Sequence, residues 1–147
     1  MYKRQVHDRG LHFDRWRDET IPIKGSCNDG NAHYFFHGVS GHAGLFSSLQ
    51  DVLTFGKTFL SADHAKLDAR LYNNTIKNWG AGRGYGIQYG ELYPDQGFGH
   101  TGFTGTYLYV NSKRGMVITI LTNRLHSHTV RNITPISLEI VGRLLGS

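Results

Sequence analysis

Hydrophobic residues repeat at helical spacing in two stretches of the chain. One stretch covers residues 48–60, where a capping box of Ser47 and Gln50 would satisfy two N–H groups at the start of a helix. The other lies near the C-terminus, where Thr134 can cap a helix and Pro135 fits its first turn. The pattern therefore predicts a helix over 48–60 and a C-terminal helix. The apolar face of the C-terminal helix would consist of Ile136, Ile140, Val141, Leu144 and Leu145.

Alternating residues predict strands in the second half of the chain. Segments 85–89, 106–110 and 116–122 are typical of strands, and residues 111–115 would join the last two as a β-hairpin. The last strand is apolar on both faces, so we expect it to be central in its sheet and covered on both sides. Its two faces carry Met116, Ile118 and Ile120 on one side and Val117 and Leu121 on the other.

The first half of the chain is less regular. Residues 12–19 and 65–72 favour short helices, while Asn-Asp-Gly-Asn at 28–31 favours a turn. Glycine at every third position of residues 38–47 is typical of a tight, irregular loop, and the aromatic residues 34–36 are expected in the core. The fold class that follows is α/β of the α+β kind. It would have an antiparallel sheet of about three strands, a flanking C-terminal helix and a helical, loop-rich N-terminal half.

The composition excludes several classes of protein. The 147 residues suffice for one domain, and a hydrophobic content of 39% is ordinary for a globular one. The net charge of +5 comes from scattered residues, with no basic run longer than Lys3-Arg4 or Lys113-Arg114, which argues against nucleic-acid binding. No apolar run is long enough to span a membrane. The single Cys27 excludes an internal disulfide and lacks a catalytic signature around it.

The first five residues, Met-Tyr-Lys-Arg-Gln, resemble the translated end of a transposon adapter. We therefore expect residues 1–5 to be a non-native scar and the natural reading frame to begin upstream of Val6. Residues 6–147 would then be the C-terminal portion of a single domain.

The chemistry of the chain is concentrated in Phe98-Gly99-His100-Thr101-Gly102-Phe103-Thr104-Gly105-Thr106. Its glycines alternate with small hydroxyl residues around one histidine. Glycine lets a ligand approach the main chain closely, and an imidazole can carry or release a proton near neutral pH. Backbone N–H groups, hydroxyls and an imidazole in one segment predict the edge of a binding or catalytic site.

Three segments together resemble a known family. Residues 28–32 lead into the glycine-rich residues 38–47, Asp51 follows on the next helix, and Phe98–Thr106 precedes a hairpin that ends in Leu121-Thr122-Asn123-Arg124. Their order and spacing are similar to those of the serine β-lactamase-like family, in the class C branch with penicillin-binding esterases and D,D-peptidases. The resemblance covers residues 28–124, most of the chain.

This resemblance implies nucleophilic acyl transfer without a cofactor. In the family a serine of a Ser-x-x-Lys motif attacks a carbonyl, its lysine helps to remove the proton, and a Tyr-x-Asn motif assists. Here His100-Thr101-Gly102 matches the third motif, which is usually Lys-Thr-Gly. The implied roles are catalytic for Phe103, whose N–H would belong to the oxyanion hole, and substrate-binding for His100, Thr101, Gly102 and Thr104.

The implied substrate is an ester, a β-lactam or a D-alanyl peptide of the cell wall, and the implied location is the cell envelope or the exterior. Thr101 would bind a substrate carboxylate or carbonyl group. A neutral imidazole attracts a carboxylate less than an ammonium group does. His100 in place of lysine therefore favours ester or peptide substrates over β-lactams.

The chain also departs from the family pattern. No Ser-x-x-Lys motif occurs in it, because the candidate serines lack a lysine three residues later; those serines are Ser47, Ser48, Ser61, Ser112, Ser127 and Ser137. Tyr72-Asn73-Asn74 fits Tyr-x-Asn but follows the glycine-rich segment instead of preceding it, so we interpret it as a chance match. We expect a fragment without its nucleophile, inactive alone and missing the N-terminal part of its domain. One sheet edge and one apolar face would be left open.

Two alternatives to a hydrolase fragment remain. One is a non-catalytic module of the same fold that binds peptidoglycan or another ligand. The other is a metal-dependent hydrolase that uses His33, His37 and His42, or His126 and His128. No carboxylate or cysteine pattern completes either histidine set, so we expect no metal site. We expect His42 to be structural, and Tyr107 and Tyr109 to be packed in the sheet.

Overall fold

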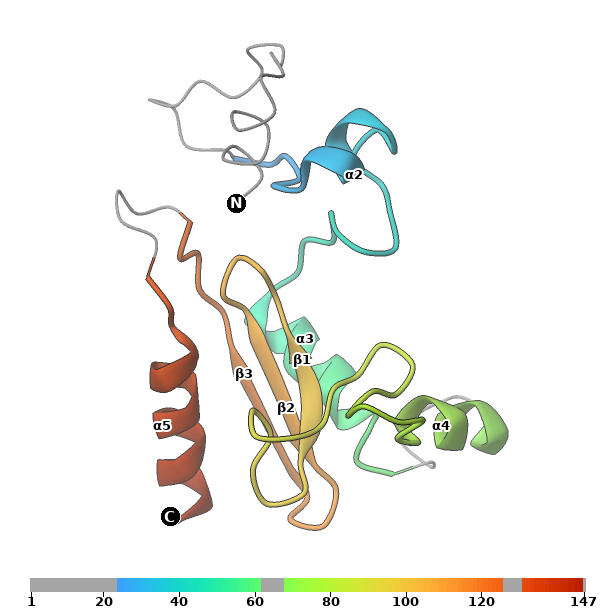
Figure 1. The fold of residues 1–147 in the computed structure, drawn as a ribbon, viewed down its shortest axis with the longest axis vertical. Coiled ribbons are helices and arrows are strands. Elements are labelled where there is room, and N and C mark those ends of the chain that lie inside the picture. The colour runs from blue at the N-terminus through green and yellow to red at the C-terminus, as the bar shows by residue number, and fades with distance from the viewer. Residues whose placement is uncertain (1–23, 62–67, 126–130, 147) are drawn as a thin grey trace. The chain divides into compact units, whose positions relative to one another are not determined.

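The computed structural model describes residues 24–61, 68–125 and 131–146. The chain divides into two compact units, Met1–Phe46 and Ser47–Ser147, and the sheet belongs to the second (Figure 1). The scar expected at residues 1–5 and the helix expected over residues 12–19 lie outside the described residues.

The N-terminal unit contains the short helix α2 (Gly30–Tyr34). Asp29 caps this helix, because its side chain accepts a hydrogen bond of 2.8 Å from the N–H of Ala32. The turn predicted over residues 28–31 is therefore wrong in its second half. Asp favours both turns and helix N-caps, and here the cap is satisfied, so the chain continues as a helix.

The rest of the N-terminal unit is loop. Residues 38–47 have no helix or extended strand, only an isolated bridge between Ser40 and Ala43, so the predicted irregular loop is confirmed. The expectation of an aromatic core is wrong, since the Phe35 side chain is 74% exposed. Cys27 and Ala32 are the buried hydrophobic residues of this described part.

The second unit is built on an antiparallel sheet of β1 (Phe98–Thr101), β2 (Tyr107–Asn111) and β3 (Met116–Ile120), in the order β1-β2-β3. The hairpin predicted from residues 106–122 is confirmed as β2 and β3, with slightly different ends. The predicted class, an antiparallel sheet with helices, is also confirmed.

The third strand differs from the prediction. Residues 85–89 do not form a strand, because Gly86 and its neighbours Gly82 and Gly90 have positive φ angles that interrupt extended backbone. Only Gln88 joins the sheet, through an isolated bridge to Gly99 of β1. The strand lies instead within the glycine-rich motif, where Phe98 pairs with Val110 of β2.

The central strand is β2, not β3 as predicted. Tyr107 of β2 pairs with Thr101 on one side and with Ile120 on the other, so β3 lies at an edge of the described sheet. The expectation that β3 is covered on both faces holds. Ile118 belongs to one buried cluster, and Val117 packs against another on the opposite face.

Within the described part of the second unit, two helices precede the sheet along the chain. Ser48 caps α3 (Leu49–Lys57), where its hydroxyl accepts from the N–H of Asp51 and donates to the Asp51 carboxylate at 2.8 Å. The predicted box of Ser47 and Gln50 is thus one residue too early, and the helix ends at Lys57 rather than at 60. The next helix, α4 (Ala69–Ile76), begins after Asp68, whose side chain accepts the N–H bonds of its first turn, and it extends beyond the predicted end at residue 72. Residues 65–67 of the predicted helix lie outside the described residues.

The C-terminal helix α5 (Thr134–Leu145) forms as predicted, with Pro135 in its first turn. Thr134 does not cap it, since Ile133 is the N-cap and makes no side-chain hydrogen bond. Its buried face also differs in part. Val141 and Leu145 are buried with Ser137, whose hydroxyl donates to the Ile133 carbonyl and is thereby satisfied. The remaining predicted core residues are exposed: Ile136, Ile140 and Leu144.

The core consists of two clusters, one on each face of the sheet. On one face the tyrosines of the sheet and Ile118 pack against Val141 and Leu145 of α5. On the other, Val110 packs with Phe59, which lies just beyond α3. Figure 1 shows α5 and α3 on opposite sides of the strands. Tyr107 and Tyr109 are 4% and 0% exposed, which confirms their predicted packing role.

Among the described residues, no helix combines the length and the apolar character needed to cross a bilayer.

Alkaline pH tests the tyrosine cluster. Burial raises the pKa of Tyr93 to about 12, and its ring stacks on Tyr107 at 5.6 Å between centroids. Because the folded pKa lies above the unfolded value of about 10, the neutral phenol stabilises the fold. This contribution is complete below about pH 10 and is lost as the pH rises toward about 12.

We expect the melting temperature to fall between about pH 10 and 12, and Tyr93→Phe to remove one late phase from the absorbance titration at about 295 nm. Tyr85→Phe, at a ring that is 62% exposed, controls for the loss of one chromophore. A late phase that persists in Tyr93→Phe would contradict this assignment.

Candidate functional site

The predicted site residues follow one another from the end of β1 into the turn before β2. Within this turn the N–H of Gly102 donates to the Thr106 carbonyl at 2.7 Å, and the N–H of Gly105 donates to the Gly102 carbonyl at 2.9 Å. Gly105 adopts a φ of +100°, which a side chain would strain. The turn therefore presents residues 101–104 on a short, hydrogen-bonded loop.

The backbone of β1 has an open edge beside this turn. Gly99 exchanges two hydrogen bonds with Gln88, of 2.7 and 3.1 Å, on the side away from β2. Alternate residues of a strand direct their N–H and C=O groups to the same side. Thr101 therefore presents its backbone groups to that edge, past the end of the Gln88 bridge. In the described part of the chain the N–H of Phe103 has no hydrogen-bond partner.

His100 and Thr101 occupy different sides of the strand. Successive side chains alternate between faces, so His100 lies on the Phe98 face and Thr101 on the Tyr107 face. The His100 ring is exposed, and its Nδ1 lies 2.7 Å from the Thr101 carbonyl oxygen. A carbonyl oxygen only accepts, so Nδ1 carries the hydrogen and Nε2 of the neutral ring is an acceptor.

A partly buried polar network lies behind Thr101. Its hydroxyl is 3.4 Å from the Gln88 side-chain amide, which also lies 2.8 Å from the Tyr93 hydroxyl. With the amide oxygen turned toward Arg83, Gln88 accepts a bond of 2.7 Å from that guanidinium and donates to Tyr93. This network restricts the position of Thr101 at the end of β1.

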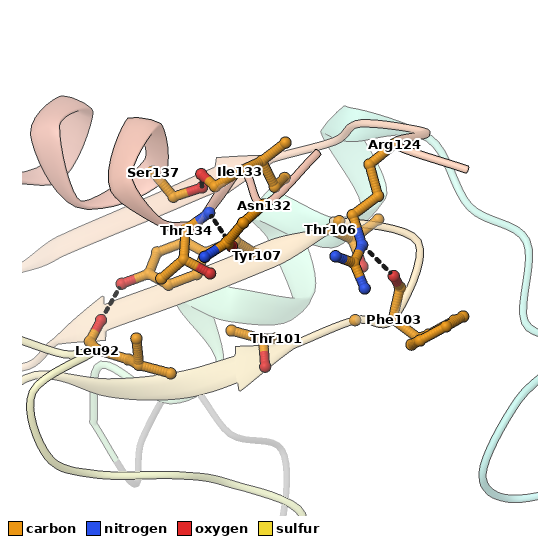
Figure 2. A pocket seen from close by; sticks show the side chains of 12 residues that line it. Leu92, Thr101, Phe103, Thr106, Tyr107, Arg124, Asn132, Ile133, Thr134 and Ser137 are labelled. Atoms are coloured by element: carbon orange, nitrogen blue, oxygen red, sulfur yellow. Dashed lines mark hydrogen bonds between the residues drawn. The ribbon is translucent and has the colours of Figure 1, made fainter. Parts of the chain in front are cut away.

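A cavity of about 260 Å³ lies between the turn and the start of α5 (Figure 2). Of the predicted site residues, Thr101, Gly102 and Phe103 line it, whereas His100 and Thr104 do not. Figure 2 shows Arg124 bonded to the Phe103 carbonyl at one end of the cavity, and Leu92 and Tyr107 at the other. The structure thus brings Thr101, Gly102 and Phe103 together at the cavity and leaves the other two predicted residues outside it.

Arg124 also lines the cavity, although the sequence did not single it out as a site residue. Its Nε donates to the Phe103 carbonyl at 2.7 Å, and its backbone N–H donates to the Thr104 carbonyl at 2.9 Å. The guanidinium carbon lies 5.1 Å from the centre of the Phe103 ring. The only available signal was its place at the end of Leu121-Thr122-Asn123-Arg124, where it resembled a strand terminus.

A second polar cluster occurs in the N-terminal unit. His42 Nδ1 lies 3.1 Å from Ser40 Oγ, and His42 Nε2 lies 3.1 Å from the Asp29 carboxylate. The Ser40 hydroxyl donates to the Ala43 carbonyl at 3.0 Å, so its single proton is directed away from the imidazole. The N–H of Ala32 and then His42 lower the pKa of Asp29. His42 thereby connects the glycine-rich loop to the cap of α2.

No group of three potential ligands that could hold a metal ion occurs among the described residues. His33, His37 and His42 are part of that search, whereas His126 and His128 lie outside the described residues. The prediction that the chain has no metal site stays a prediction.

Comparisons with known proteins identify the family to which the chain is similar. The model of the family described as Beta-lactamase matches residues 2–141. A protein of Escherichia coli (strain K12) named "Putative D-alanyl-D-alanine carboxypeptidase" is 33% identical over 139 residues, which cover 83% of this chain and 31% of that protein. A protein of the same name from Salmonella agona (strain SL483) is 32% identical over 138 residues, or 83% of this chain and 32% of its own length. The chain thus spans about a third of the length of these curated relatives. No solved structure matches it.

Proposed function

Because this chain belongs to the Beta-lactamase family, we propose that the β1 edge is the substrate-binding wall of a serine acyl-transfer site. The family resemblance predicted from the motifs is confirmed by the family model, and the chain is a relative of serine hydrolases. The proposed substrate is a peptide that ends in D-alanine, as in the name of the relatives, or an ester of similar shape.

The open edge of β1 is the observation that carries this proposal. An extended peptide adds to a sheet edge through main-chain hydrogen bonds. Thr101 offers an N–H there, and its C=O, which accepts from His100 Nδ1, keeps a second lone pair. The N–H of Phe103, in the turn that follows β1, would donate to the carbonyl oxygen under attack. Gly102 donates to Thr106 on the opposite side, which fixes the turn without using the edge.

The nucleophile is not proposed to come from this chain, because its sequence contains no Ser-x-x-Lys. We propose that residues 6–147 are the C-terminal portion of a hydrolase domain whose remaining part supplies that serine, and that residues 1–5 are non-native. His100, Gly102 and Thr104 keep their proposed substrate-binding roles. His100 in place of lysine favours peptide or ester substrates, and a cell-wall substrate would place the protein in the cell envelope.

Peptide binding tests the proposal without requiring turnover. We expect N-acetyl-D-alanyl-D-alanine to shift the amide resonances of Thr101 and Phe103 in the 147-residue chain, and the L,L-peptide to shift them less. Phe103→Pro removes the edge N–H and should weaken binding roughly fivefold, the value of about one hydrogen bond. Phe103→Ala keeps that N–H and is the matched control. Resonance shifts confined to residues away from β1 would contradict the proposal.

The second candidate is a binding module without catalysis. It is favoured by the absence of Ser-x-x-Lys from this chain, and it would use the same edge for peptidoglycan peptides. The longer coding sequence distinguishes the two candidates. Ser-x-x-Lys and Tyr-x-Asn upstream of residue 6 would support the hydrolase, and their absence there would support the module.

A further inference from the structure

Arg83 and Gln88 face each other across a short turn that precedes β1 in the chain. They form an isolated antiparallel bridge, beside which the N–H of Tyr89 donates to the Gly82 carbonyl at 2.9 Å. Two residues directly opposite in such a pair place their side chains close together on the same side. The backbone therefore positions the guanidinium of Arg83 next to the side-chain amide of Gln88.

The guanidinium determines which end of the Gln88 amide it contacts, because arginine only donates hydrogen bonds. The amide oxygen accepts from Nη1 of Arg83 at 2.7 Å. The amide nitrogen then lies on the other side, where it donates to the Tyr93 hydroxyl oxygen at 2.8 Å. In the parts of the chain that the structure describes, no carboxylate pairs with Arg83 and competes for its donors.

The Thr101 hydroxyl lies on the same side of the amide as Tyr93. Gln88 pairs with Gly99 of β1, and Thr101 is two residues further along that strand, on the same face. Thr101 Oγ1 lies 3.4 Å from the amide atom that faces Tyr93. An amide nitrogen at that position only donates, so Thr101 cannot give its hydroxyl proton to Gln88. An amide oxygen there would accept that proton.

Tyr93 does not take up this proton either. Burial raises the pKa of Tyr93 to about 12, although Thr101 lowers it in part. The phenol therefore keeps its own proton near neutral pH, and its oxygen already accepts from Gln88. Tyr93 is thus a donor toward Thr101, whose side chain lines the cavity beside the turn. The hydroxyl proton of Thr101 remains for a ligand in that cavity.

We propose that Arg83 is a positioning residue that acts through Gln88 to make the Thr101 hydroxyl a hydrogen-bond donor toward a peptide at the β1 edge. Without Arg83 the amide would reverse, and its oxygen would accept the Thr101 proton. The hydroxyl would then offer the peptide only its lone pairs. This inference rests on the proposed function, since it assumes that an oxygen of the peptide lies beside Thr101.

The orientation of the Gln88 amide is measured first, by NMR of the 147-residue chain without a ligand. We expect nuclear Overhauser effects from the Gln88 side-chain NH₂ protons to the Thr101 methyl group and to the Tyr93 ring. Arg83→Met should weaken both effects, and Arg83→Lys should keep part of them. Arg70→Met, at an exposed arginine of α4, is the matched control and should leave them unchanged. Effects that are equally strong in Arg83→Met would overturn the inference.

Binding of N-acetyl-D-alanyl-D-alanine measures the consequence for the ligand. We expect Arg83→Met and Thr101→Val each to weaken binding roughly fivefold, the value of about one hydrogen bond. Gln88→Glu should weaken it by a similar factor, because a carboxylate keeps the contact with Arg83 but presents an acceptor to Thr101. The double variant of Arg83→Met and Thr101→Val should bind no more weakly than Thr101→Val alone, since Arg83 acts through that hydroxyl. Additive losses would contradict this route.

The outcomes separate this inference from the proposed function. If no dipeptide binds at the edge, the proposed function fails, while the nuclear Overhauser effects still decide whether Arg83 sets the orientation of the amide. If Thr101→Val weakens binding and Arg83→Met does not, the role of Arg83 is overturned and the edge proposal stands.

Discussion

Gly99→Ala is expected to unfold much of the sheet, with a loss of at least about 3 kcal/mol in the free energy of unfolding. A Cβ at position 99 would overlap the carbonyl oxygen of Leu108 and come within 3.0 Å of Tyr93 Cε1. Leu108 is in the paired strand β2, so its carbonyl cannot move without breaking the ladder. For a unit of this size the loss corresponds to roughly 12 °C or more in melting temperature.

Thermal unfolding followed by circular dichroism measures the effect of Gly99→Ala. Gly41→Ala is the matched control, because a Cβ there meets open space and the backbone is not in the left-handed region. We expect the control to melt within about 2 °C of the parent chain. A Gly99→Ala chain that melts alongside the control would show that β1 is not held against β2 as described.

This steric requirement revises the interpretation of the glycine-rich motif. From the sequence, its glycines were expected to let a ligand approach the backbone. In the structure Gly99 is needed for close packing against β2, and Gly102 for close approach to Thr106. The feature available to a ligand is instead the backbone of Thr101 and Phe103 at the open edge. Glycine content pointed to this segment, and the structure shows which of its backbone groups are already used in packing and turn hydrogen bonds.

The hairpin could be predicted from the sequence because its information is local. Residues 107–120 alternate in hydrophobicity and surround a loop of turn-forming residues, and both strands pair with their neighbours in sequence. β1 is four residues long and half of it is glycine or histidine, so periodicity does not reveal it. Its pairing with β2 and its bridge to Gln88 depend on tertiary packing, which a local pattern does not contain.

The difference between local patterns and tertiary contacts also explains which cavity residues the sequence could indicate. Thr101 and Phe103 could be proposed from the sequence because they belong to one motif with an unusual composition. Arg124 lies 21 residues after Phe103 and reaches the motif through its hydrogen bond to the turn. The predicted buried face of α5 was wrong in part, because the helix carries two apolar stripes with the same helical period. The hydroxyl of Ser137 is satisfied by its bond to the Ile133 carbonyl, which lets this polar residue lie on the buried stripe.

The 147-residue chain is expected to form no acyl-enzyme and to leave chromogenic esters and cephalosporins unhydrolysed above the buffer rate. The family reaction requires a serine whose proton is removed by a nearby base, and no serine here has the Ser-x-x-Lys lysine. An enzyme that loses its activated nucleophile keeps at most the rate contributions of binding and of the oxyanion hole. Relative to an intact enzyme of this kind, its rate of hydrolysis should be lower by about 10⁴-fold or more. Ester hydrolysis and mass spectrometry after incubation with a fluorescent penicillin measure this directly.

Ser40 is the serine on which a contrary result would most plausibly arise, because its hydroxyl oxygen lies 3.1 Å from His42 Nδ1 and the ring contacts Asp29. The bond from Ser40 to the Ala43 carbonyl is the reason to expect no reaction there. If a covalent adduct forms, Ser40→Ala should abolish it and Ser47→Ala should not. Such an adduct would place an acyl-transfer centre in the N-terminal unit and would overturn the view that the nucleophile comes from outside this chain.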